Sequence, residues 1–200
     1  SNLLKHAKKW IIDDGNSTLL LPELKYKKEF FGIKKPVNYK LINYDTSLPE
    51  NLNIFTIYRI KLKNNDKLYK NKLSFLSKSI KYSDKGNIVF IGSAFIEDNE
   101  IEIEDFLKKL DSALSYLRNK YSNKIIYMPH RREKIKLKEK ILSKYDIKVV
   151  RPNLPVELFI TSNNFKTFFI TGFISSAFDT LSVIIKKRTF INSFYLNEKY

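Results

Sequence analysis

The sequence has no cysteine among its 200 residues. Disulfide bonds and thiolate metal sites are therefore excluded, and the composition suits a reducing compartment, so we expect a cytoplasmic location. No apolar run approaches the roughly 20 residues that a membrane-spanning helix needs. The first five residues, SNLLK, lack the apolar core of a signal peptide. These absences predict a globular protein with no membrane span and no visible export signal.

Acidic residues are scarce relative to basic ones. Aspartate and glutamate number 21 against 37 lysines and arginines, so the formal net charge is +16. Such a surface attracts anions, including anionic lipid headgroups, where a well-placed lysine or arginine contributes about 1 kcal/mol. We therefore expect peripheral contact with the inner face of the plasma membrane. No RNP, KH or zinc signature accompanies the charge, so we expect no specific nucleic-acid binding.

The first 85 residues show little regular pattern. An apolar strand is predicted over 10–12, and it ends at the turn-forming residues 13–17. A second strand is predicted over 54–58. The remainder of 23–84 mixes lysines with aromatic residues and predicts no regular element.

From Gly86 onward, short β-branched runs alternate with helical periods, which is typical of an α/β fold with a parallel sheet. A helix is predicted over 104–121, with apolar residues on one face, acidic residues at its start and basic residues at its end. A lysine-rich helix up to about Tyr145 and a short helix from Ser176 are also predicted. The predicted strands are 88–91, 124–128, 148–150, 158–160 and 167–170.

His130 is the first candidate for chemistry. It follows the predicted strand 124–128 and precedes Arg131 and Arg132, and ligands of open α/β sheets bind beyond the carboxyl ends of the strands. An imidazolium beside arginines at a helix start can hold a phosphate and can stabilise or protonate it as a leaving group. An exposed loop histidine is the structural alternative, and spacing alone does not separate the two.

Ser175 and Ser176 follow Gly172 at the end of another predicted strand and open a helix. Two hydroxyls and the first backbone N–H groups of a helix suit a phosphate. Serine is also a good N-cap, and for the pair taken alone capping is the favoured interpretation.

Acidic residues complete the candidate site. Asp13 and Asp14, followed by Gly15, can supply the base that removes a proton from an acceptor hydroxyl, although Asp-Gly is also a common turn. Glu157 precedes the predicted strand 158–160, where its carboxylate can accept hydrogen bonds from both hydroxyls of a ribose, or it is simply solvated. No second carboxylate cluster has a ligand-like spacing, so we expect no metal site.

Four segments occur in an order and spacing that match one family: DDG at 13–15, YMPHRRE at 127–133, PVE at 155–157 and GFISSA at 172–177. On these residues the chain resembles bacterial sialyltransferases of the lipooligosaccharide and capsule type, similar to glycosyltransferase family 52, and more distantly the bacterial polysialyltransferases. The resemblance runs from about Trp10 to about Leu181. It implies a GT-B-like architecture of two Rossmann-type domains. It also implies an inverting, metal-independent and cofactor-free transfer of sialic acid from CMP-sialic acid to a terminal sugar of a surface glycan.

The resemblance also implies roles for the candidate residues. Asp13, or Asp14 in its place, would be the general base, and His130 would bind the CMP phosphate and assist its departure. Ser175 and Ser176 would hold the same phosphate. Glu157 would bind the ribose diol, and Gly92 would let the cytidine lie close to the backbone. The implied donor-binding residues are Gly92, Arg131, Arg132, Glu157, Ser175 and Ser176.

Two departures from the family pattern affect the interpretation. Many relatives have His-Pro where this chain has Pro129-His130-Arg131, which favours the lipooligosaccharide branch over the polymerising branch. Only 12 residues precede Asp13, too few for the rest of an acceptor-side domain. We therefore expect that the chain lacks its N-terminal part and that the fragment alone can be inactive. Residues 1–85 would then be the C-terminal part of the acceptor-side domain with the connection. Residues 86–200 would be the CMP-sugar-binding domain, with the last ~20 residues crossing back.

Two alternatives remain. The first is another GT-B-type transferase with a CDP-linked or CMP-linked donor, similar to the teichoic-acid glycerophosphate polymerases, which also place histidine and paired serines near a phosphate. The second is a non-enzymatic, basic nucleic-acid-binding domain. The expected partners are a nucleotide sugar and a glycan acceptor, and the sequence leaves open the acceptor sugar, the linkage and the choice between monomer and homodimer.

Overall fold

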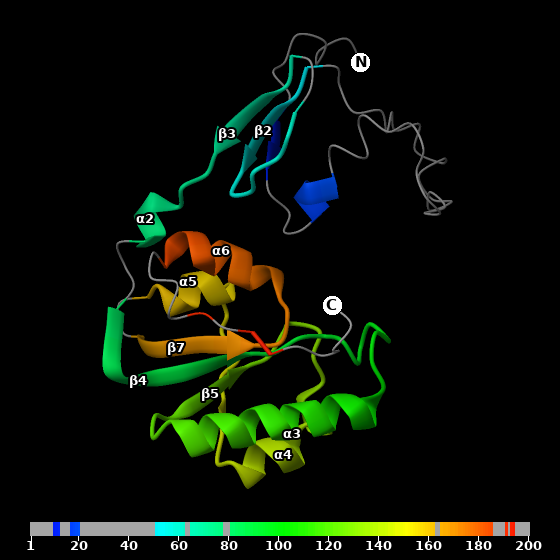
Figure 1. Ribbon diagram of the computed structural model, residues 1–200, viewed down its shortest axis with the longest axis vertical. Helices are drawn as coiled ribbons and strands as arrows, with labels where there is room; N and C mark the ends of the chain where they lie inside the picture. The colour runs from blue at the N-terminus through cyan, green and yellow to red at the C-terminus, as the bar shows by residue number, and fades with distance from the viewer. Residues whose placement is uncertain are drawn as a thin grey trace. The chain divides into compact units, whose positions relative to one another are not determined.

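The computed structural model contains two compact units, Ser1–Lys72 and Leu73–Tyr200 (Figure 1). The residues that it describes are 10–12, 17–20, 51–62, 65–77, 81–162, 165–185, 191 and 193–194. Across these ranges, no helix combines the length and apolar character needed to cross a membrane.

The Ser1–Lys72 unit contains a parallel three-stranded sheet in the order β1-β2-β3. Leu52, Ile54 and Ile60 form its small buried core. The strands are β1 (Trp10–Ile12), β2 (Asn53–Thr56) and β3 (Lys67–Lys70). A 3-10 helix, η2 (Ser17–Leu20), lies between β1 and β2 in the sequence.

The first two of these strands confirm the predictions at 10–12 and 54–58, within a residue or two at their ends. The sequence pattern does not predict β3. All four of its side chains are exposed, so the segment lacks the apolar alternation by which a strand is detected.

The Leu73–Tyr200 unit is built on a parallel four-stranded sheet in the order β6-β5-β4-β7. Four of the predicted strands are confirmed, and β4 begins earlier than predicted. Residue 85, the expected domain limit, therefore lies inside a strand. The strands are β4 (Lys81–Ile91), β5 (Ile125–Met128), β6 (Lys148–Val149) and β7 (Lys166–Gly172).

Helices cover both faces of this sheet. The helix α3 (Ile103–Lys120) and the helix α4 (Glu139–Lys144) lie on one face, and α5 (Val156–Ile160) and α6 (Ser176–Ile184) lie on the other (Figure 1). The 3-10 helix η4 (Ile135–Leu137) precedes α4. The short helix α2 (Ser74–Ser77) contacts α6. The predicted α/β fold with a parallel, Rossmann-type sheet is confirmed.

The alternating side chains of the strands explain the three layers. In β4, Ile88 and Phe90 pack into the core under α3, whereas Val89 and Ile91 pack into the core under α6. Successive side chains of a strand point to opposite faces, so a strand that is apolar throughout needs a helical layer on each side. Burying one such side chain contributes about 1.5–3 kcal/mol.

The helix α3 confirms the prediction for 104–121 in position and in orientation. Its buried residues recur at helical spacing, with Glu104 and Asp105 in its first turn and Arg118 and Lys120 in its last. These charges complement the helix dipole at both ends. The buried residues are Phe106, Leu110, Ala113, Leu114 and Leu117.

The predicted strand at 158–160 is wrong, because this segment belongs to the helix α5. The N–H of Phe159 donates to the carbonyl of Pro155, and the N–H of Thr161 donates to the carbonyl of Glu157. A short apolar run does not by its pattern distinguish a strand from a buried helical turn. Pro155 is the N-cap of α5, where its missing N–H leaves no hydrogen bond of the helix unmade. Glu157 therefore lies in the first turn of a helix rather than before a strand.

Ile191 and Phe194, two described residues near the C-terminus, lie beside β7 and the residue that follows it. Ile191 forms a parallel bridge with Ile170, and Phe194 forms one with Phe173. The ring of Phe194 also stacks on that of Phe90, with centroids 6.2 Å apart. These described positions therefore extend the sheet beyond β7.

Candidate functional site

The candidate site is a pocket of about 390 Å³ at the carboxyl ends of the four parallel strands. Residues that follow β4, β5, β6 and β7 all contribute to its wall. In an open parallel sheet, ligands bind at this edge, where the chain order reverses. Here β5 lies on one side of β4 and β7 on the other, so the reversal falls at β4. The lining residues are 91–92, 128–131, 151–152, 154–157 and 175–177.

This pocket brings together most of the donor-binding residues predicted from the sequence. Those that line it are Gly92, His130, Arg131, Glu157, Ser175 and Ser176. Arg132 does not line it. Its guanidinium forms a bidentate pair with Asp98 instead. Asp13 and Asp14 lie outside the described residues.

A larger hollow, of about 650 Å³, lies near the opposite ends of β5 and β6. Its wall includes Arg118, Lys124 and Lys148. The guanidinium of Arg118 donates hydrogen bonds to the carbonyls of Tyr145 and Asp146 and is thereby committed to the fold. The smaller pocket has the better claim to function, because polar groups from several segments converge there.

His130 is half-buried and follows β5 after a single proline. Its Nδ1 accepts a hydrogen bond from the backbone N–H of Arg132 at 3.3 Å. An accepting Nδ1 places the proton of the neutral ring on Nε2. Burial lowers the pKa of His130, and the guanidinium charges of Arg132 and Arg131 lower it further. The free site therefore holds a neutral imidazole at neutral pH.

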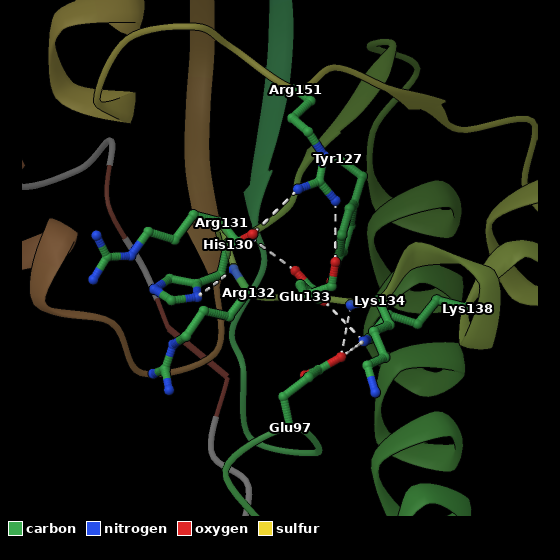
Figure 2. Close-up of polar contacts among 9 residues, drawn as sticks. All are labelled: Glu97, Tyr127, His130, Arg131, Arg132, Glu133, Lys134, Lys138 and Arg151. Atoms are coloured by element: carbon green, nitrogen blue, oxygen red, sulfur yellow. Dashed lines mark hydrogen bonds and ion pairs between the residues drawn. The ribbon is translucent and has the colours of Figure 1, made fainter.

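The turn that carries His130 is closed by Glu133. The N–H of Glu133 donates to the carbonyl of His130 at 2.9 Å. The N–H of His130 donates to Oε2 of Glu133, also at 2.9 Å. The same carboxylate accepts a hydrogen bond from the hydroxyl of Tyr127 through Oε1 (Figure 2). Both oxygens of the Glu133 carboxylate therefore accept hydrogen bonds, one from His130 itself and one from Tyr127, three residues before it.

A buried lysine neutralises this carboxylate. Lys138 is fully buried, with Nζ 3.1 Å from Oε1 of Glu133 and 3.7 Å from Oε1 of Glu97 (Figure 2). Its ammonium also lies 5.2 Å from the centroid of the Phe106 ring. Burial raises the pKa of Glu133, while Tyr127 and Lys138 oppose that rise. The lysine thus favours the charged form of a carboxylate whose pKa burial raises.

Arg151 joins the end of β6 to the same turn. Its guanidinium donates to the carbonyl of Glu133 at 3.0 Å and to that of Arg131 at 3.3 Å. Arg151 also lines the pocket, and it brings a second exposed cationic side chain to the wall beside Arg131.

Ser175 is the N-cap of α6. Its Oγ accepts a hydrogen bond from the N–H of Ala177 at 3.3 Å, which confirms the capping interpretation for this serine. A hydroxyl that accepts one hydrogen bond still has a proton to donate, so the cap does not exclude a ligand. Ser176 is exposed and lines the same wall.

Glu157 places a half-buried carboxyl at the wall of the pocket, in the first turn of α5. Burial raises the pKa of Glu157 above its usual range. The sequence selected Glu157 as a binding residue, and the residue lines the pocket. It lies in a helix, however, and not before a strand.

Gly92 has no side chain because another group occupies that space. A Cβ at this position would lie 2.1 Å from Oε2 of Glu133 and 2.8 Å from the hydroxyl of Tyr127. Both distances are far shorter than any van der Waals contact. A glycine after β4 is therefore required by the buried carboxylate of the neighbouring turn.

Sequence reasoning missed Arg151 and Lys138. It included Tyr127 and Glu133 in the segment YMPHRRE but gave neither a role. Arg151 follows a predicted strand, so the strand-end rule that selected His130 applied to it equally. Lys138 carried no such signal, because it is one of several lysines in a lysine-rich stretch. Within the described residues, no three His, Asp or Glu side chains are grouped as metal ligands would be.

Comparison with known proteins identifies one family. The sequence matches the family described as Alpha-2,8-polysialyltransferase (POLYST) over residues 14–192. No curated protein and no protein of solved structure matches the sequence significantly. The matched range includes the whole of the pocket wall.

Proposed function

Because the chain belongs to the alpha-2,8-polysialyltransferase family, we propose that its Leu73–Tyr200 unit binds CMP-sialic acid in the 390 Å³ pocket. The protein is a sialyltransferase, which transfers sialic acid from a nucleotide-sugar donor to a glycan acceptor. Our proposal extends this to a terminal sugar of a bacterial lipooligosaccharide or capsule as the acceptor. The lipooligosaccharide branch, inferred from Pro129-His130-Arg131, remains a proposal.

One observation supports the donor site above the others. Six residues selected from the sequence for donor binding, drawn from four separate segments, line one pocket at the switch point of the sheet. The order of these segments along the chain does not by itself require that they meet. Their convergence is what a nucleotide site of a Rossmann-type domain demands.

The proposed binding mode follows the charges of the wall. The CMP phosphate lies near His130, Arg131 and the start of α6, where Ser175 and Ser176 donate hydrogen bonds. Departure of CMP leaves negative charge on the phosphate, and donors fixed at that position stabilise the transition state. Loss of one such donor typically costs about 3 kcal/mol of activation free energy.

The other contacts come from Glu157 and Gly92. The carboxyl of Glu157 would accept hydrogen bonds from the ribose diol. The backbone of Gly92, which lines the pocket at the end of β4, would lie beside the cytidine, while Glu133 fills the space on its side-chain side. Asp13 or Asp14 would act as the general base on the acceptor hydroxyl, in an inverting reaction that uses no metal and no cofactor. In this scheme the cationic side chains of the wall supply the charge that neutralises the leaving phosphate.

The site is tested by calorimetric titration of the chain with CMP and with an unreactive CMP-sialic acid analogue. We expect saturable binding to the wild type and at least about tenfold weaker binding to His130→Ala, as for loss of a hydrogen bond to a charged group. His6→Ala is the matched control, because His6 is the other histidine and belongs to the Ser1–Lys72 unit. Absence of binding to folded wild-type protein would refute the donor site. Binding of CDP-glycerol in its place would support the CDP-linked alternative.

We also propose that the basic surface holds the enzyme against the cytoplasmic face of the membrane. The support is the net charge of +16, which attracts anionic lipid over about one Debye length. Sedimentation with vesicles tests this idea. Binding should require anionic lipid and should weaken as salt increases, whereas equal binding to neutral vesicles would refute it.

A further inference from the structure

The turn from His130 to Glu133 depends on contacts from outside itself. Within the turn, the N–H of Glu133 donates to the carbonyl of His130, and the N–H of Arg132 donates to Nδ1 of His130 at 3.3 Å. The side chains of Arg131 and Arg132 are exposed. An isolated turn with so few hydrogen bonds does not hold a single conformation against chain entropy.

The side chain of Glu133 links the turn to residues outside it. Oε2 accepts the N–H of His130 at 2.9 Å, and Oε1 accepts the hydroxyl of Tyr127 and faces the ammonium of Lys138 at 3.1 Å. Tyr127 belongs to β5, and its ring stacks on Phe90 of β4 with centroids 5.6 Å apart. The carboxylate therefore connects the turn to the centre of the sheet and to the start of α4 (Figure 2).

Residues after two further strands contact Glu133 or the backbone of its turn. The Cα of Gly92, after β4, leaves the space that Oε2 of Glu133 occupies. Arg151, after β6, donates to the carbonyls of Arg131 and Glu133. Three strand ends therefore meet at the turn, two of them at the Glu133 side chain and one at the turn backbone, and all three contribute to the pocket wall.

Stability does not explain why an ion pair is used here. Well-packed apolar residues usually stabilise a core as well as, or better than, a buried ion pair. A carboxylate can do what an apolar group cannot, because it accepts hydrogen bonds from several directions at once. The location of the pair directly behind the pocket histidine indicates that its value is geometric.

We propose that Glu133 is a positioning residue for the nucleotide site. Its carboxylate, held by Lys138 and Tyr127, orients His130 and Arg131 toward the pocket. This inference deepens the proposed donor site and rests on it for its functional meaning. Glu133 itself does not line the pocket, so it acts through the turn and not on the ligand.

The substitution Glu133→Gln tests the proposal, because positioning and charge predict opposite shifts of the His130 pKa. Loss of a nearby negative charge disfavours the imidazolium and lowers that pKa. A loosened turn exposes the ring to water and raises it, since burial is the first cause of its depression. The charged groups that shift the pKa of the ring are Arg131, Arg132, Asp98 and Glu97. Glu133 is not among them, and the substitution leaves all four unchanged.

The pKa is measured by NMR titration of the imidazole, and CMP affinity by calorimetry. Glu139→Gln, an exposed glutamate in the first turn of α4, is the matched control. We expect a raised His130 pKa and at least about tenfold weaker CMP binding in Glu133→Gln, as for a lost charged hydrogen bond, and no change in the control. An unchanged or lowered pKa overturns the proposal, whatever happens to the affinity.

Hydrogen exchange of the His130 amide in the wild-type chain provides a second test that needs no variant. This N–H is bonded to a buried carboxylate, so it should exchange slowly in the folded protein. Exchange at the rate of an open loop overturns the positioning role. If the wild type does not bind CMP, the donor site fails, while the exchange rate and the imidazole titration still decide whether Glu133 positions the turn.

Discussion

Removing the buried ammonium of Lys138 should destabilise the Leu73–Tyr200 unit more than removal of any exposed lysine on the same helix. In Lys138→Met the side-chain volume is kept, but Glu133 and Glu97 lose the cation that lies 3.1 and 3.7 Å from them. Breaking a buried ion pair by removing one partner costs about 3–5 kcal/mol. For a chain of this size, that corresponds to a decrease in Tm of roughly 6–20 °C.

Urea unfolding followed by circular dichroism at a helical wavelength measures this loss, because the 18-residue helix α3 belongs to the same unit. Lys140→Met, on the exposed face of α4, is the control, and it should cost less than about 0.5 kcal/mol. Equal effects of the two substitutions would refute the view that Lys138 neutralises buried carboxylates.

The pH dependence provides an independent check on the same reasoning. Burial raises the pKa of Glu133 in the folded protein, so the folded state binds this proton more tightly than the unfolded state does. The contribution of this group is therefore favourable at low pH and is lost as the pH rises through the folded pKa. Without Lys138 that pKa rises further. The gap in stability between wild type and Lys138→Met should then be small near pH 4 and largest at neutral pH.

Three other outcomes are expected. Gly92→Ala places a Cβ 2.1 Å from Oε2 of Glu133, so it should cost about 1–3 kcal/mol of stability by overpacking and should weaken CMP binding. Thermal unfolding measures the loss of stability, and calorimetric titration measures the loss of CMP affinity. Ser175→Ala should cost about 1 kcal/mol as a lost N-cap, and Ser176→Ala less, by urea unfolding; equal costs would contradict the capping geometry. Binding of the CMP-sialic acid analogue should strengthen as the pH falls toward the lowered pKa of His130, because the bound phosphate favours the imidazolium, and this dependence should vanish in His130→Ala.

The sequence predicted those elements that have a long apolar pattern or two independent features that indicate the same structure. The helix α3 has both a regular apolar stripe and complementary charges at its ends. The strands β4 and β5 are apolar on both faces and lie between turn residues. The segment 158–160 had neither feature, because three apolar residues fit a helical turn as well as a strand. Its true state depends on packing against the sheet, which no local pattern contains.

The candidate site shows the same division. His130, Glu157 and Ser175 could be selected because residues after parallel strands converge at one edge of the sheet. The support behind them could not be selected. Glu97 and Lys138 are separated along the chain by the whole of α3 and β5, and only the finished fold brings their side chains to Glu133. Buried polar networks are fixed by tertiary structure, so local sequence patterns do not reveal them.

The close approach of Gly92 to Glu133 limits how this pocket can diverge. A side chain at residue 92 is disfavoured as long as residue 133 keeps its carboxylate in this place, so we expect the two positions to vary together. The wall formed by residues 154–157 has no such constraint from the buried carboxylate. New donor specificity should therefore be sought first in that segment between β6 and α5, where a changed side chain alters the pocket without moving the histidine.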